Sequence, residues 1–196
     1  MNFKTLIFLI LVLFSSTFAQ ALSVKPLSLR QKVLVSDMVF MGTVTDIKRT
    51  LDPKDSFKRI ATYTFSIEDC FKGNCDQKTV EIKQLATGPG AVTYTINETY
   101  FLFLTKESEK TGLVAPVGFM QGSIPFTKKQ GVWAPKKNYR QSGLIKDLQK
   151  ESSVTFAKDP ILALNLMPLY LSPTVDYSIF KETVKVIVED QKNIKE

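Results

Sequence analysis

The chain of 196 residues contains no histidine. Most serine and cysteine nucleophiles are activated by a histidine base, and metalloproteases of the H-E-x-x-H type bind zinc through two histidines. The composition therefore excludes these enzyme classes and almost every zinc site. We expect neither a metal nor a cofactor. For catalysis, only a carboxylate pair or a serine–lysine pair would remain.

The chain also lacks an apolar run of the roughly 20 residues that a membrane-spanning helix needs. A shorter run at residues 6–14 follows Lys4 and precedes a small-residue stretch that ends at Ala21. This order is typical of a secretory signal. We interpret residues 1–21 as a signal peptide and residues 22–196 as one mature domain without a transmembrane segment, secreted or periplasmic. An uncleaved membrane anchor is the alternative.

Cysteine occurs only twice, as Cys70 and Cys75. Exported proteins mature in oxidising compartments, so we expect these residues to form a disulfide. Residues 60–67 and 79–85 have strand character and predict a hairpin whose turn, residues 71–74, lies between the cysteines. Facing residues of antiparallel strands lie about 4.5–5.5 Å apart at Cα, which suits a disulfide. A metal site and a redox-active pair are the alternatives.

Two patterns resemble those of serine β-lactamases and penicillin-binding proteins. Ser178 and Lys181 match S-x-x-K, and residues 110–112 match K-T-G, but their order along the chain is reversed. We expect the first pattern in a terminal helix and the second in an exposed turn. Glu68 and Asp69 are the nearest carboxylate pair, but neighbours on a strand point to opposite faces. The sequence therefore predicts a protein that is not an enzyme.

Strand patterns dominate the chain up to residue 135. A short helix at residues 28–35, with Ser28 as N-cap, precedes them. We expect residues 51–58 to form a polar loop and Gly42 to mark a bulge or bend. The expected strands are residues 38–47, 60–67, 79–85, 91–96, 99–104, 113–117, 123–127 and 132–134. Residues 99–104 are nearly all apolar and predict a strand buried on both faces. Many short strands separated by turns favour one closed or nearly closed barrel.

The last third of the chain has a different character. Residues 143–150 predict a short helix, and residues 160–173 predict an extended segment that lies on the barrel. A final amphipathic helix is expected to begin near Asp176 or Ser172, which would cap it. Its apolar face comprises Tyr177, Phe180, Val184, Ile187 and Val188. We expect this face to pack on the barrel, with a helix on a membrane surface as the alternative.

The formal net charge of the chain is +7. Such a charge favours approach to anionic surfaces such as lipid headgroups or acidic glycans. The only tryptophan, Trp133, lies among Lys128, Lys129, Lys136 and Lys137. We hypothesise that these five residues bind an anionic glycan or a membrane interface through charge and ring contacts. The alternative is a solvated turn with Trp133 pointing into the core.

Several short motifs suggest a family. Residues 36–44 contain Ser36, Asp37, Val39 and Val44, and the strand at residues 63–68 leads into Phe71-Lys72-Gly73. Both segments resemble the tissue inhibitors of metalloproteinases and the related netrin-type modules. Further motifs at residues 100–104, at residues 121–126 (Gln-Gly-x-Ile-x-Phe) and at residues 143–145 resemble uncharacterised exported bacterial proteins of that type. The resemblance covers about residues 29–145.

The resemblance implies a mainly β fold, a five-stranded OB-like barrel with flanking short helices. It does not imply the inhibitory mechanism. In that family a cysteine at the mature N-terminus chelates the zinc of the protease, whereas this chain would begin near Leu22 with no cysteine close by. The dense disulfide framework of the family is also missing.

These observations predict an exported, non-enzymatic binding module that works through barrel loops and one face. Its ligand would be a protein or an anionic envelope component. An inhibitor or accessory subunit of an exported protease or envelope complex is the alternative. Export argues against nucleic acid as a partner.

Overall fold

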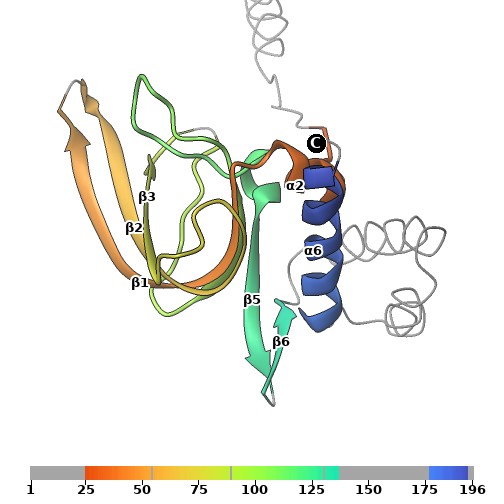
Figure 1. The fold of residues 1–196 in the computed structure, drawn as a ribbon. Coiled ribbons are helices and arrows are strands. Elements are labelled where there is room, and N and C mark those ends of the chain that lie inside the picture. Colours follow the sequence, from red (N-terminus) through yellow and green to blue (C-terminus); the bar gives the residue numbers. More distant parts are fainter. Residues whose placement is uncertain (1–24, 54, 89, 130, 137–176, 194–196) are drawn as a thin grey trace, which may run out of the picture.

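The computed structural model describes residues 25–53, 55–88, 90–129, 131–136 and 177–193 (Figure 1). Within these ranges one antiparallel sheet has the strand order β3-β2-β1-β4-β5-β6. In the described residues, two α-helices and a 3-10 turn accompany it. The strands are β1 (Met38–Asp52), β2 (Asp55–Lys72), β3 (Thr79–Leu85), β4 (Thr99–Leu104), β5 (Ser123–Lys129) and β6 (Val132–Pro135); the helical elements are α2 (Leu29–Val35), η1 (Phe119–Gly122) and α6 (Tyr177–Asn193).

The expected closed five-stranded barrel is wrong, because the six-stranded sheet is open. In the described part of the chain, β3 and β6 are its edges and do not pair with each other. β1 pairs with β2 from Val39 to Asp52 but with β4 only from Met38 to Thr43. β4 has six residues and β6 has four, so neither is long enough to follow β1 and β2 to their far end. The sheet therefore bends without closing.

Six of the eight expected strands are confirmed, and two are not. Residues 91–96 form no strand, and in residues 113–117 only Pro116 contributes, through one isolated bridge to Leu104. A proline has no backbone N–H to continue a ladder. The expected bulge at Gly42 is confirmed by a register shift between Met41 and Gly42. The expected polar loop at residues 51–58 is wrong, since β1 extends to Asp52 and β2 begins at Asp55, and these two residues pair with each other.

The sheet separates two hydrophobic clusters. Along β1, Val39 and Met41 face the helices, whereas Phe40 faces the opposite side. This opposite side is the concave one, because β1 and β2 curve away from the helices (Figure 1). β4 alternates in the same way, with Phe101 toward the helices and Leu102 away from them. Every residue of β4 is buried, which confirms the prediction for residues 99–104. A strand between two apolar layers needs no polar face, and this explains its uninterrupted apolar sequence.

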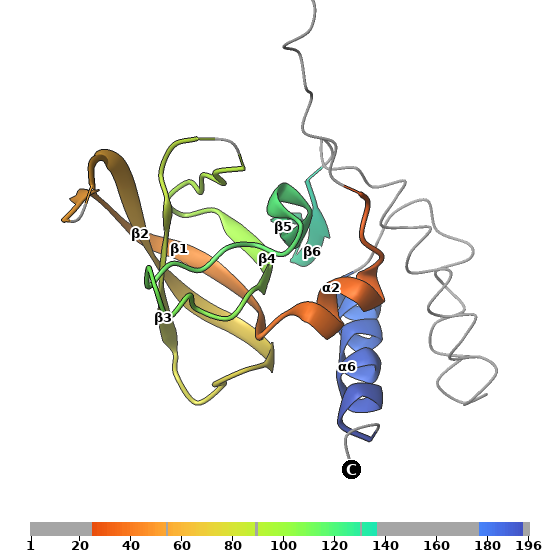
Figure 2. The same ribbon diagram turned by 90° about the horizontal axis from the view of Figure 1, so that it is seen from above.

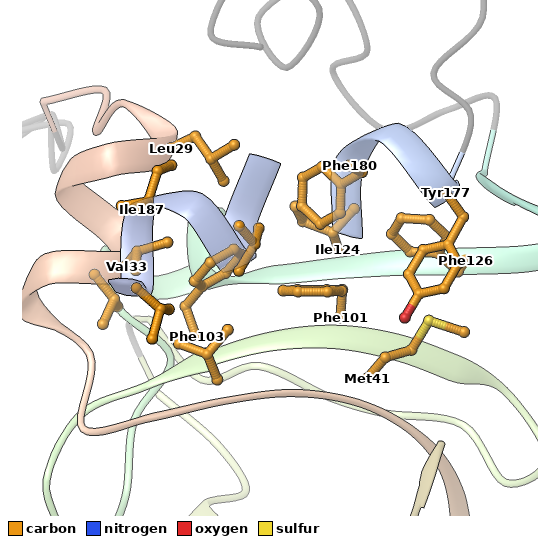
Figure 3. Packing of buried hydrophobic residues seen from close by; sticks show 14 residues of the cluster. Leu29, Val33, Met41, Phe101, Phe103, Ile124, Phe126, Tyr177, Phe180 and Ile187 are labelled. Carbon is orange, nitrogen blue, oxygen red and sulfur yellow. The ribbon is translucent and has the colours of Figure 1, made fainter. Parts of the chain in front are cut away.

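The two α-helices lie side by side on one face of the sheet (Figure 2). Ser28 caps α2 as expected, and a capping box with Gln31 completes the cap. All five residues of the apolar face predicted for the terminal helix are buried, which confirms its packing on the sheet. Figure 3 shows Phe180 and Tyr177 of α6 above Phe101 and Phe126 of the strands. The caps predicted at Asp176 and Ser172, the helix at residues 143–150 and the segment at residues 160–173 lie outside the described residues.

Cys70 and Cys75 form a disulfide with a Cα–Cα distance of 5.5 Å, as predicted. They are not a facing pair of the β2–β3 hairpin, however. Cys70 lies opposite Phe40 of β1, and the pairing of β2 with β3 ends at Ser66. Cys75 lies in the loop that follows β2. The disulfide therefore closes a loop at the end of β2.

The segment Phe71-Lys72-Gly73 holds this loop against α2. The Phe71 ring packs on Phe101, with centroids 5.1 Å apart. The Lys72 ammonium donates to the Val33 carbonyl at 2.9 Å, in the last turn of α2. Cations are favoured there because the last carbonyls of a helix have no partner within the helix. Gly73 has a φ of +97° and approaches Met38 closely. One of the motifs behind the family resemblance is thus explained by packing.

Candidate functional site

The predicted lysine–tryptophan patch lies on the hairpin of β5 and β6. Lys128 is paired with Trp133 across the two strands, and its ammonium lies 5.5 Å from the centroid of the indole ring. That distance is typical of a cation–π contact. Trp133 is half-buried and packs against the cluster under the helices. The structure thus brings these two residues together. Lys137 and the side chain of Lys129 lie outside the described part.

Lys136, the remaining member of the patch, is turned toward the sheet. Its ammonium forms an ion pair and hydrogen bond with the Glu98 carboxylate. The same carboxylate accepts a hydrogen bond from the Tyr100 hydroxyl at 2.8 Å. These two hydrogen bonds hold the pKa of Glu98 below its usual range, and the bond from Lys136 has the larger effect. Part of the charge expected for the patch is therefore neutralised by Glu98.

The Glu98 network predicts a loss of stability in acid. Because the pKa of Glu98 is lowered on folding, its contribution is present above the unfolded pKa, near 4.5, and is lost as the pH falls through the folded pKa. We expect Glu98→Gln to reduce the pH dependence of urea unfolding in this range. Glu109→Gln removes an exposed carboxylate paired with Lys106 and is the matched control. Identical acid profiles for the wild type and Glu98→Gln would contradict the prediction.

Asp69 joins β2 to α6. One carboxylate oxygen accepts from the Tyr177 hydroxyl at 2.5 Å, and the other accepts from the Lys181 ammonium at 2.6 Å. Burial, followed by the bond to Asp69, raises the pKa of Tyr177. Ser178 and Lys181 lie in α6 as expected, and residues 110–112 lie in a turn in which the N–H of Gly112 donates to Ser108. Lys181 therefore links α6 to β2 through its ion pair with Asp69.

The Glu68–Asp69 carboxylate pair lies at the bulge opposite Gly42. Met41 pairs with Asp69 and Gly42 with Ile67, so Glu68 is the extra residue. Glu68 accepts from the Thr43 hydroxyl at 3.2 Å, while Asp69 binds α6. The two carboxylates are thus bonded to different elements. Across the described ranges, no three histidine, cysteine, aspartate or glutamate side chains are grouped as a metal site would require.

The concave side of the sheet buries a small polar cluster. The hydroxyls of Tyr63 and Tyr94 and the amide of Gln84 have no hydrogen-bond partner within the described residues. Burial raises the pKa of Tyr94, so its phenol stays neutral at physiological pH. The nearby side chains of Gln84 and Ser123 act in the opposite direction and lower the pKa of Tyr94. Neither forms a hydrogen bond of normal geometry with the Tyr94 hydroxyl. This cluster offers neutral hydrogen-bonding groups but no charged base.

The far end of the β1–β2 hairpin is the feature that the sequence reasoning missed. We call residues 49–53 and 55–59 the ribbon tip. It extends past the end of β3, whose pairing with β2 ends at Ile60, and lies across the molecule from α6 (Figure 1). Phe57 is 93% exposed there and Leu51 is 57% exposed. The signal for it in the sequence is an aromatic residue in a polar stretch rich in lysine and arginine.

Local bonds shape the ribbon tip. A carboxylate oxygen of Asp55 accepts from the backbone N–H of Phe57 at 3.1 Å. The other oxygen pairs with the Lys58 ammonium at 3.2 Å. Both contacts, with the backbone bond as the larger cause, lower the pKa of Asp55. Asp55 therefore fixes the backbone that carries Phe57 away from the sheet, and it does so as an anion at neutral pH.

No family model matches the chain, and no curated protein sequence matches it significantly. In the described part of the chain, no helix combines the length and the apolar character needed to cross a membrane.

Proposed function

We propose that this protein is an exported, non-enzymatic binding module that recognises its partner through the ribbon tip. One observation carries the proposal. Phe57 is 93% exposed, lies near the end of two paired strands and belongs to neither core cluster. Leaving a large aromatic side chain in water gives no folding energy, because apolar surface stabilises only when it is removed from water. Its burial against a partner would recover that energy.

The export part of the proposal is supported by the signal-like order of residues 1–21 and by the disulfide. A disulfide persists in secreted and periplasmic proteins and is rare in a reducing cytosol. The Lys128–Trp133 contact is a weaker candidate for the binding surface. Its indole packs on the core, and its neighbour Lys136 is paired with Glu98.

The second candidate function is inhibition of, or an accessory role in, an exported protease or envelope complex. The resemblance to the tissue inhibitors of metalloproteinases motivates it, and membership of that superfamily is part of the proposal. The ribbon tip is compatible with an inhibitor, since an exposed aromatic side chain can enter a cleft of a partner protein. The zinc-chelating N-terminal cysteine has no counterpart here. Protein contacts would have to replace it.

The proposal predicts that retention on cell-envelope material depends on the ribbon tip. The exported full chain, wild type or Leu51→Ser/Phe57→Ser, is incubated with the envelope fraction of the producing cells and sedimented. We expect the double variant to be retained about fivefold less, as expected when two exposed apolar contacts are lost. Met120→Ser, which changes a side chain that is 71% exposed on η1, is the matched control. Equal retention of all three proteins would refute a role for the tip.

A further inference from the structure

The charges of the ribbon tip are arranged around its exposed apolar residues. Leu51 of β1 lies opposite Arg59 of β2, and Arg49 lies two residues before Leu51 on the same strand. Facing residues and residues two apart share one face of a ribbon, so the two arginines flank Leu51. All three side chains are exposed. This face continues outward from the concave side of the sheet, where Ala61 and Tyr63 are buried.

Two acids of the hairpin are paired with lysines. Asp46 pairs with Lys48 at 3.5 Å, and Asp55 pairs with Lys58 at 3.2 Å. Neither Arg49 nor Arg59 forms an ion pair with any residue that the structure describes. A planar guanidinium matches the oxygens of a phosphate bidentately. The tip therefore presents two phosphate-binding groups beside two exposed apolar side chains.

We propose that the ribbon tip docks on the surface of an anionic phospholipid bilayer, with Phe57 and Leu51 entering the headgroup region and Arg49 and Arg59 binding lipid phosphates. This inference rests on the proposed function. A lipid interface offers phosphate and hydrocarbon within a single shallow layer, which matches both kinds of side chain at the tip. An acidic glycan supplies the charge but no hydrocarbon for Phe57.

The geometry suits insertion without a change of fold. The tip is the end of a narrow two-stranded hairpin, and Asp55 already holds the backbone at Phe57. Only side chains outside both core clusters would enter the lipid. Two apolar side chains and two cations give reversible, salt-sensitive attachment, unlike a membrane-spanning segment.

Vesicle sedimentation tests the inference. The exported full chain is mixed with vesicles of phosphatidylcholine alone, or with vesicles in which about a third of the lipid is phosphatidylglycerol. We expect the wild type to bind the anionic vesicles about tenfold more tightly, with a loss of binding in high salt. Arg49→Gln/Arg59→Gln should weaken binding to the anionic vesicles at least about fivefold. Leu51→Ser/Phe57→Ser should weaken binding to both kinds of vesicle.

A charge-matched control separates a local effect from the net charge. Lys106→Gln/Lys110→Gln removes two exposed cations far from the ribbon tip in sequence and should bind like the wild type. Equal losses in this variant and in Arg49→Gln/Arg59→Gln would overturn the proposal. So would a wild type that fails to bind anionic vesicles. If envelope retention nevertheless depends on Leu51 and Phe57, the partner is a protein, and the proposed function stands without the lipid inference.

Discussion

Replacing Phe101 by alanine is expected to lower the free energy of unfolding by about 3–5 kcal/mol. Phe101 lies on β4 and is fully buried. Its ring centroid lies 4.7 Å from that of Phe180 on α6 and 5.1 Å from those of Phe71 and Phe103. The substitution therefore leaves a cavity between β4 and the terminal helix, whose packing Figure 3 shows. A loss of this size is a large part of the 5–15 kcal/mol typical of a whole domain.

Urea unfolding followed by fluorescence measures this loss. The single tryptophan, Trp133, packs against the same cluster and reports on it directly. Phe57→Ala removes the same ring from the ribbon tip and is the matched control. Its effect should lie within about 0.5 kcal/mol, because surface substitutions outside packed regions usually change little. A Phe101→Ala protein as stable as this control would show that the helices do not depend on this contact.

The second large effect is expected at Gly122, where alanine should cost about 3 kcal/mol or prevent folding. A Cβ at this position would lie 2.5 Å from the backbone nitrogen and oxygen of Val117 and 2.8 Å from the carbonyl oxygen of Phe103. All three are backbone atoms, so no side chain can rotate away. The same two residues share a hydrogen bond, from the Val117 N–H to the Phe103 carbonyl, at 2.8 Å. Relieving the clash would break it.

Gly131→Ala provides the comparison for Gly122→Ala. A Cβ at Gly131 meets no atom within 4 Å, but the backbone there has a φ of +84°. This variant should lose about 1 kcal/mol, the cost of a left-handed conformation alone. Thermal or urea unfolding of both variants separates the two causes. A smaller loss at Gly122 than at Gly131 would contradict the close approach of the backbones.

Stability and proposed binding depend on different parts of this molecule. Phe101 and Gly122 lie where β4 meets the helices and the η1 turn, whereas Phe57 and Leu51 lie in the ribbon tip. Distant sites without shared partners act nearly independently. Variants of the ribbon tip can therefore lose binding while the fold is retained, and unfolding measurements on the same proteins can verify this.

The family resemblance rests on residues whose roles in the structure are largely architectural. Lys72 binds the end of α2, Phe71 packs on Phe101, and Gly122 lets two backbones meet. Gln121 is another example, since its amide bonds the Leu27 N–H at 2.8 Å and the Lys25 carbonyl at 3.2 Å. These contacts hold the segment before α2 against the η1 turn. Such motifs carry information about how a chain folds and much less about what it binds.

Local and periodic features could be predicted from the sequence. The capping box at Ser28 and the apolar face from Tyr177 to Val188 depend only on residues within a few positions of one another. The doubly apolar strand β4 and the disulfide between neighbouring cysteines are of the same kind. The absence of histidine likewise required no structure to exclude whole classes of chemistry.

Contacts between distant residues were decided by the tertiary structure. Alternation shows which face of a strand is buried. It does not show which strand lies beside it or where pairing stops, so a closed or nearly closed barrel was expected and an open sheet was found. The pairing of Lys136 with Glu98 spans 38 positions and that of Lys181 with Asp69 spans 112. The ribbon tip projects only because β1 and β2 stay paired beyond the end of β3, and this length of pairing depends on contacts in space.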